Sequence, residues 1–169
     1  MISKKMTEAL NKRINEEIYS AYLYLSMASH ATVIGLKGFA SWFQIQVREE
    51  LFHAQKIYNY VLDQDTKVTL GAIAKPPANF KSPTELFEKT LAHEKGVTAA
   101  INKVVDLARQ EKDHATEAML QWFVTEQVEE EAMANDVLQQ LKLVGTDGSG
   151  LFMIDRQLAT RTFTPPPAE

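Results

Sequence analysis

The sequence contains no cysteine, which excludes disulfide bonds, zinc–thiolate sites and iron–sulfur clusters. It also has no apolar run of about 18 residues, so we expect no membrane-spanning helix and no membrane partner. The first five residues lead directly into an amphipathic segment, without the apolar region that a secretory signal requires. Together these absences predict a cytoplasmic protein.

The chain has no excess of basic residues either. Lys and Arg number 18 against 22 Asp and Glu, so the formal net charge is −4 at pH 7. Surfaces that bind nucleic acids are basic, and we therefore expect no nucleic-acid partner. The 169 residues, 45% of them apolar, are enough for one domain with a sizeable core.

Glycine and proline are scarce, at seven and six residues, and they cluster between long stretches in which apolar residues recur every three or four positions. This spacing predicts helices. The expected helices span residues 5–33, 37–64, 83–110, 114–143 and 148–159. Ser82 and Glu85 form a predicted capping box at the start of the third helix, and Asp113 is the predicted N-cap of the fourth.

The connections predict how these helices are arranged. The first and second helices, and likewise the third and fourth, are joined so closely that each pair must be antiparallel. Roughly 18 residues separate the second helix from the third, and this segment can reach about 60 Å. A hairpin would need far fewer residues. We therefore expect an all-α fold at residues 1–163, a four-helix bundle with one long crossover plus a short fifth helix, followed by a mobile Pro-rich tail at 164–169.

Each of the four long helices carries a glutamate at a position where the periodicity demands a core residue. These glutamates are Glu17, Glu50, Glu94 and Glu130. A buried, unpaired carboxylate costs several kcal/mol, and four of them in one core would also repel each other. Because we recognise no Arg or Lys on the same faces, we expect metal cations to neutralise these carboxylates.

Two of the helices add a second polar residue one turn away. Glu50 and His53 form a Glu-x-x-His pair, and Gln127 and Glu130 are spaced in the same way. Oxygen ligands with one imidazole suit a pair of iron or manganese ions better than structural zinc. One inward Glu is more often hydrogen-bonded in the core, and Glu-x-x-His alone is a weak signal. The combination on four helices favours a two-metal site.

Four stretches of the sequence resemble the non-haem bacterial ferritins, and the likeness extends over essentially the whole chain. The stretches are residues 15–24, 48–54, 93–94 and 126–131. The resemblance implies a ferritin-like bundle, a ferroxidase centre in each subunit and a hollow homo-oligomeric shell of 24 subunits. It also implies that the fifth helix lines the four-fold contacts, through Leu151, Phe152, Ile154 and Leu158. The alternative is that this helix only caps its own bundle.

The resemblance also assigns iron ligands. The first iron site would comprise Glu17, Glu50 and His53. The second would comprise Glu50, Glu94 and Glu130, with Glu50 bridging the two ions and Gln127 nearby. A third iron site would comprise Glu49, Glu126 and Glu129 with the shared Glu130, and its alternative is a solvated acidic face.

Tyr24 matches the tyrosine that the family places beside the centre. The resemblance implies that it donates a hydrogen bond to Glu94 or an electron to the site, and the alternative is a half-buried core tyrosine. Haem is not expected, because Leu51 stands where bacterioferritins have a haem-ligating Met and Glu130 stands where they have His. We expect His93 to be a surface or packing residue, and Trp42 and Trp122 to lie in the core or at an interface.

The expected function is iron storage with ferroxidase activity, in which O2 or H2O2 oxidises Fe(II) and a ferric mineral grows inside the shell. One alternative is a di-metal carboxylate oxygenase or peroxidase that acts on an organic substrate. A second alternative is a cage subunit without catalysis, against which the complete set of ligands argues.

Overall fold

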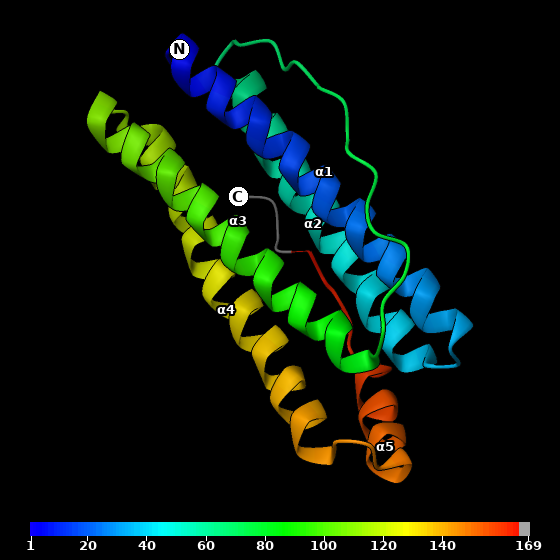
Figure 1. Ribbon diagram of the computed structural model, residues 1–169. Coiled ribbons are helices and arrows are strands. Elements are labelled where there is room, and N and C mark those ends of the chain that lie inside the picture. Colours follow the sequence, from blue (N-terminus) through cyan, green and yellow to red (C-terminus); the bar gives the residue numbers. More distant parts are fainter. Residues whose placement is uncertain (166–169) are drawn as a thin grey trace.

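The computed structural model describes residues 1–165, and within this range the chain is entirely helical, without a strand (Figure 1). The helices are α1 (Lys4–Val33), α2 (Lys37–Asp63), α3 (Pro83–Glu111), α4 (His114–Val144) and α5 (Gly148–Leu158). Each predicted helix end lies within one residue of the observed end, and the predicted all-α fold is confirmed. Residues 166–169 of the predicted tail lie outside the described residues. No helix in the described range is long and apolar enough to cross a membrane.

The crossover between α2 and α3 has the predicted path. It leaves α2 at one end of the bundle and runs beside α1 to the other end, where α3 begins, so α2 and α3 are parallel (Figure 1). Two asparagines of α1 fix it in place. Asn11 Oδ1 accepts a hydrogen bond from the Thr69 N–H at 3.1 Å, and Asn15 Oδ1 accepts one from the Gly71 N–H at 2.9 Å. The long connection is therefore an ordered part of the bundle surface.

The predicted helix starts are present, with one change of detail. Ser82 Oγ accepts the Glu85 N–H at 3.1 Å, and Asp113 Oδ1 accepts the Thr116 N–H at 3.0 Å. The Glu85 carboxylate, however, accepts the N–H of Lys81, one residue earlier than a capping box requires. Both helices thus begin where side-chain oxygens satisfy their first free N–H groups.

The hydrophobic core is divided into two clusters by a polar layer. In α1, Ile14 belongs to one cluster and Leu23 to the other, with Glu17 between them. In α4, Phe123 and Val137 flank Glu130 in the same way. The four inward glutamates therefore lie at one level of the bundle, where the apolar core stops on either side.

Helix α5 packs against its own bundle at the start of α2. Ile154 and Leu158 are buried there, as the alternative for this helix expects, whereas Phe152 is 60% exposed. Asp155 Oδ1 accepts the N–H groups of Gly38 at 2.7 Å and Phe39 at 3.0 Å, so α5 caps α2. Gly38 permits this contact, since a Cβ atom there would lie 1.6 Å from the Asp155 carbonyl oxygen.

Candidate metal centre

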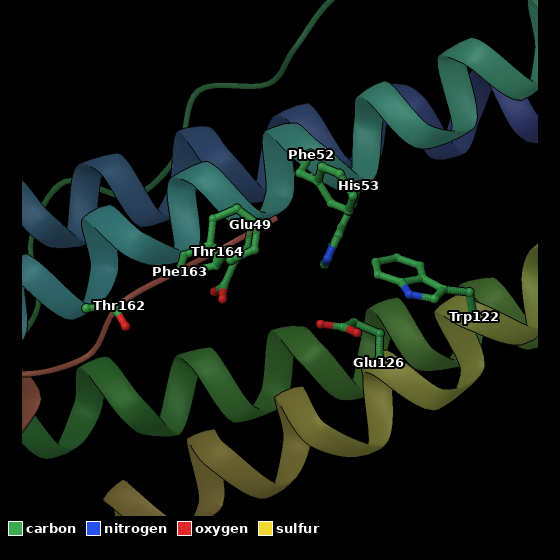
Figure 2. Close-up of a pocket in the computed structure, with 8 residues that line it drawn as sticks. All are labelled: Glu49, Phe52, His53, Trp122, Glu126, Thr162, Phe163 and Thr164. Carbon is green, nitrogen blue, oxygen red and sulfur yellow. The ribbon is translucent and has the colours of Figure 1, made fainter. Parts of the chain in front are cut away.

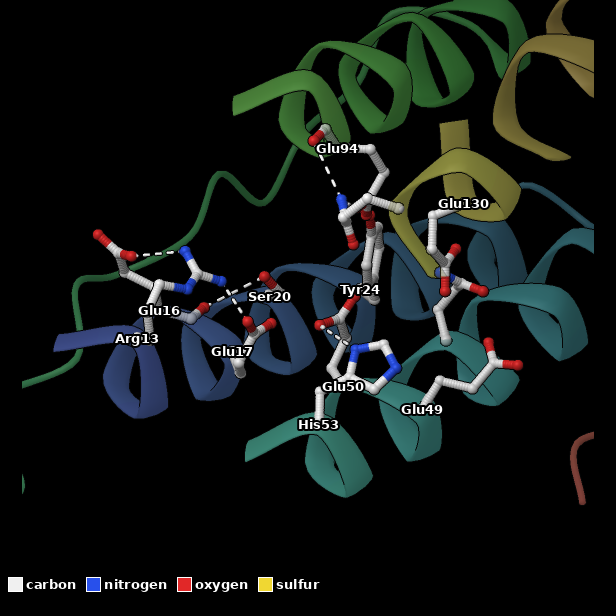
Figure 3. Close-up of polar contacts among 12 residues, drawn as sticks. Arg13, Glu16, Glu17, Ser20, Tyr24, Glu49, Glu50, His53, Glu94 and Glu130 are labelled. Atoms are coloured by element: carbon white, nitrogen blue, oxygen red, sulfur yellow. Dashed lines mark hydrogen bonds and ion pairs between the residues drawn. The ribbon is translucent and has the colours of Figure 1, made fainter. Parts of the chain in front are cut away.

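The four inward glutamates converge between the long helices (Figure 3). Glu17, Glu50, Glu94 and Glu130 are each 1–2% exposed. Each continues the apolar stripe of its helix, so the packing of the stripes necessarily brings the carboxylates together. The layer predicted from periodicity is present as a cluster of buried acids.

Two of these glutamates form a compact group with a histidine. Ligand atoms of Glu17, Glu50 and His53 all lie within 4.8 Å of one another. His53 Nδ1 is 3.6 Å from Glu50 Oε2, as the one-turn spacing of Glu-x-x-His predicts. The structure thus brings together the three residues expected at the first iron site.

The remaining two glutamates are held by hydrogen bonds. The Tyr24 hydroxyl donates to Glu94 Oε1, and Gln127 Nε2 donates to Glu94 Oε2 at 3.2 Å. Gln46 Nε2 donates to Glu130 Oε2 at 2.9 Å. The expected hydrogen bond from Tyr24 to Glu94 is therefore present. Tyr24 is also fully buried, so the alternative of a half-buried tyrosine is wrong. Gln127 thus orients Glu94 through its amide N–H groups.

Several carboxylate oxygens in the centre have no hydrogen-bond partner among the described residues. They are Glu17 Oε2, Glu50 Oε2 and Glu130 Oε1, and all three are buried. Leaving such a group unsatisfied costs more than a hydrogen bond returns. Oxygen atoms contributed by three helices, next to an imidazole, suit iron, so the residues present fit the metal that the sequence predicts.

Electrostatics keeps most of these carboxylates protonated when no metal is bound. Burial, with repulsion from Glu94 and Glu17, raises the pKa of Glu50 well above its usual range. Burial raises the pKa of Glu94 to about 7, and burial with repulsion from Glu94 raises the pKa of Glu130 to about 8. Burial lowers the pKa of His53, which favours the neutral imidazole that binds metals.

The expectation that no Arg or Lys shares these faces is wrong. Arg13 is 2% exposed, donates through Nη2 to Glu17 Oε1 and forms an ion pair with Glu16 at 2.6 Å (Figure 3). Burial alone would raise the pKa of Glu17, but attraction by Arg13 and His53 outweighs it and lowers that pKa. The four-residue spacing of Arg13 and Glu17 was visible in the sequence. Long basic side chains usually extend to solvent, however, and this one is enclosed.

The residues expected at the third iron site differ in exposure. Glu49 is buried, Glu126 is partly buried and Glu129 is exposed. Repulsion links them, since Glu129 contributes to raising the pKa of Glu126, and Glu126 to raising that of Glu49, in each case after burial. Ligand atoms of His53, Glu126 and Glu130 also lie within 4.8 Å of one another, which joins this cluster to the centre.

Comparison with known proteins agrees with this geometry. Residues 7–144 match the family model described as a ferritin-like domain. The chain is 40% identical over 163 residues to the bacterial non-heme ferritin of Staphylococcus aureus, covering 96% of this chain and 98% of that protein. The chain belongs to the ferritin family. Bacterial non-heme ferritin of Staphylococcus saprophyticus is 39% identical over the same length.

Solved ferritin structures superpose closely on this ferritin chain. An engineered closed form of the Archaeoglobus fulgidus ferritin is 51% identical, with a TM-score of 0.96, and covers 97% of this chain and 100% of its own. The open-pore ferritin from the same archaeon is 50% identical, with a TM-score of 0.95 and coverages of 96% and 100%. The described fold is thus that of ferritins over nearly the whole chain.

Some residues around the ferritin centre were not predicted as part of it. Gln46 holds Glu130, and Arg161, which follows α5, binds Glu49 at 2.7 Å. Gln46 lies on the inward face of α2, and that position was its only signal. Arg161 lies in a segment without periodicity, so its partner could not be predicted from the sequence.

Two residues expected to serve packing do so. His93 Nε2 lies 2.8 Å from Ser20 Oγ, and its ring and that of Tyr24 are nearly perpendicular, with centroids 5.9 Å apart. Trp42 is 3% exposed and packs against Phe43. Neither side chain adds a ligand to the centre.

Proposed function

We propose that this chain is an iron-storage ferritin subunit that oxidises Fe(II) at a di-iron centre within its own helical bundle. The observation that carries the proposal is the set of three buried carboxylate oxygens, next to His53, that have no hydrogen-bond partner in the part of the chain that the structure describes. The curated relatives are named bacterial non-heme ferritins, which supports the same function.

In this proposal each ion is held by residues of two or three helices. Glu17, Glu50 and His53 bind the first Fe(II), and Glu50, Glu94 and Glu130 bind the second. Glu50 is the shared ligand, since its carboxylate is near enough to both Glu17 and Glu94 for their charges to raise its pKa. Tyr24, Gln127 and Gln46 keep the second pair of carboxylates in position. Iron binding replaces the protons that hold Glu50, Glu94 and Glu130 neutral.

The reaction takes one electron from each ion. With dioxygen, two Fe(II), one O2 and two protons give two Fe(III) and one H2O2. With peroxide, two Fe(II), one H2O2 and two protons give two Fe(III) and two waters. Two ions about 3.5–4 Å apart suit this chemistry because one small oxidant can accept both electrons at once. The ferric ions hydrolyse to a mineral and release protons.

Storage requires an enclosed volume, so we propose a shell of 24 copies. Large apolar residues stay exposed on the outer sides of α1 and α2, among them Tyr22, Leu25 and Leu51 at 48–50%. Phe152 and Met153 of α5 are exposed as well. Apolar surface of this kind is typical of contacts between subunits, and it supports a homo-oligomer.

The alternative of an oxygenase with an organic substrate is less well supported. The pocket beside the centre has a volume of about 210 Å³ and is lined in part by Glu49 and Glu126 (Figure 2). Pockets that enclose organic ligands are usually about 300–1,000 Å³ and mostly apolar. A small acidic pocket favours the passage of metal ions.

Anaerobic titration of the metal-free protein with Fe(II), followed by an oxygen pulse, tests the proposal. Calorimetry should show two tightly bound ions per chain and a weaker third, and stopped-flow absorbance should show rapid oxidation of the bound pair. Size-exclusion chromatography with light scattering should give the mass of 24 subunits. One bound ion or none per chain would rule out the di-iron assignment.

A further inference from the structure

The segment after α5, residues 159–165, returns to the bundle beside the acidic pocket. Thr162, Phe163 and Thr164 line that pocket together with Glu49 and Glu126 (Figure 2). The ring of Phe163 lies 6.1 Å from that of Phe52 on α2. The segment therefore covers part of the pocket that lies between His53 of the proposed centre and Glu49 and Glu126 of the proposed third site.

Arg161 anchors this segment through contacts on three sides. Its Nη2 donates to Glu49 Oε2 at 2.7 Å, and its Nη1 donates to Gln46 Oε1. The guanidinium also lies over the Trp42 ring, 4.7 Å from the centroid. The Arg161 side chain is only 15% exposed, so the ion pair with Glu49 is largely shielded from water.

The same side chain is linked to a proposed iron ligand. Gln46 accepts from Arg161 and donates to Glu130 Oε2 at 2.9 Å. Attraction by Arg161 also opposes the effect of burial on the pKa of Glu49, Glu126 and Glu130. The guanidinium thus provides positive charge at the acidic cluster where the third ion is proposed.

A metal ion at Glu49 would meet this guanidinium directly. A divalent ion and a guanidinium on the same carboxylate repel each other, and the repulsion is stronger where burial keeps water away. The ion must therefore replace Arg161 on Glu49 or bind beside it with lower affinity. Arg161 makes no hydrogen bond to Glu17, Glu50 or Glu94 among the described residues.

We propose that Arg161 is a positioning residue that holds Glu49 and Gln46 and competes with metal for Glu49, so that the centre fills before the third site. This inference rests on the proposed function. When the third ion binds, the guanidinium leaves Glu49 and Trp42, and the peptide bond after Arg161 becomes accessible.

Anaerobic calorimetry with Fe(II) and the metal-free, full-length protein tests this order. In Arg161→Gln the third ion should bind at least about tenfold more tightly, because it no longer competes with a charged hydrogen bond. The first ion should bind as in the parent, because Arg161 makes no hydrogen bond to Glu17, Glu50 or His53 among the described residues, and its binding also shows that the variant is folded. Arg161→Lys, which keeps the charge, should stay closer to the parent than Arg161→Gln. Arg156→Gln removes an arginine of α5 that lies over Phe152, and it should match the parent.

A second readout does not depend on oxidation. Trypsin cleaves after arginine, so mass spectrometry should detect faster loss of residues 162–169 from the parent once the third ion is bound. Unchanged or weaker third-ion binding in Arg161→Gln would overturn the inference, and so would cleavage that does not respond to the third ion. A parent that binds fewer than two ions would instead contradict the proposed function.

Discussion

The acidic layer has two sides, Glu17 on α1 and Glu94 with Glu130 on α3 and α4, and the negative charge of these buried carboxylates is neutralised differently on each side. On α1, Glu17 is paired with the buried Arg13, and its pKa is lowered. On α3 and α4, Glu94 and Glu130 accept no hydrogen bond from an arginine within residues 1–165, and their pKa values are raised to about 7 and about 8. One side is neutralised by a fixed cation, and the other by protons that iron can replace. A ligand cluster can therefore be stable without metal and still be ready to bind it.

Glu50 joins the two sides, so its loss should have the largest effect. Glu50→Ala removes the shared ligand, and we expect the rapid oxidation phase in stopped-flow absorbance to slow by about a thousandfold, because the ions are no longer held as a pair. The metal-free variant should be at least as stable as the parent, since the substitution removes a carboxyl whose ionisation is opposed by burial and by Glu94 and Glu17. Glu129→Ala, at an exposed position, is the control and should keep the first turnover. A parental rapid phase in Glu50→Ala would place the centre elsewhere.

Substitutions on the two sides of the acidic layer, at Arg13 and at Glu130, should change the stability of the metal-free protein in opposite directions. Arg13→Gln leaves Glu17 without its buried partner and should destabilise the metal-free protein by about 3 kcal/mol. Glu130→Gln keeps an oxygen for Gln46 and removes a carboxyl that resists ionisation, so at pH 8 it should raise stability. Urea unfolding followed by circular dichroism measures both. If both variants shift the urea midpoint in the same direction, the two sides do not differ as described.

The pH dependence should follow the proton-neutralised side. Glu94 and Glu130 bind protons more tightly when folded, so their contribution to stability is complete below pH of about 4.3 and is lost as pH rises to about 8. Between pH 5 and 8 the metal-free protein should thus become less stable, while Glu17 loses its contribution only in more acidic solution. Iron affinity should rise over pH 6–8, by about tenfold per pH unit for each proton displaced. Calorimetry that finds the same affinity at pH 6 and pH 8 would contradict this assignment.

The smallest effect is expected at Tyr24. Tyr24→Phe removes the hydroxyl that holds Glu94, a hydrogen bond to a carboxylate that contributes about 1.5 kcal/mol. Burial then raises the pKa of Glu94 further, and at pH 7 the second ion should bind about tenfold more weakly while the first is unchanged. Phe43→Leu, beside Tyr24 in the core, controls for altered packing. Equal weakening of both ions in Tyr24→Phe would show that the hydroxyl is not specific to Glu94.

The helices and the glutamate layer could be predicted because both depend on local periodicity. Each stripe of apolar residues defines an inward face, and Glu17 or Glu130 on that face has nowhere else to lie. The neutralising cations could not be predicted in this way. Arg13 was not recognised as an inward residue, because long basic side chains usually extend to solvent. Arg161 is brought to Glu49 only by the tertiary path of the segment after α5. Periodicity predicts which residues face inward, but not which flexible side chains reach them.

The cap that α5 provides for α2 has a consequence for symmetry. Asp155 accepts hydrogen bonds from two N–H groups at the start of α2. The N-cap residue of α2, Leu36, has an apolar side chain that cannot do so. If α5 turned away from the bundle, those N–H groups would lose their acceptor. The same two hydrogen bonds therefore favour one orientation of α5 in every copy of the chain. Phe152 and Met153 then point the same way from each copy. A closed particle repeats the same contact by rotation, and this requires α5 to have the same orientation in every copy.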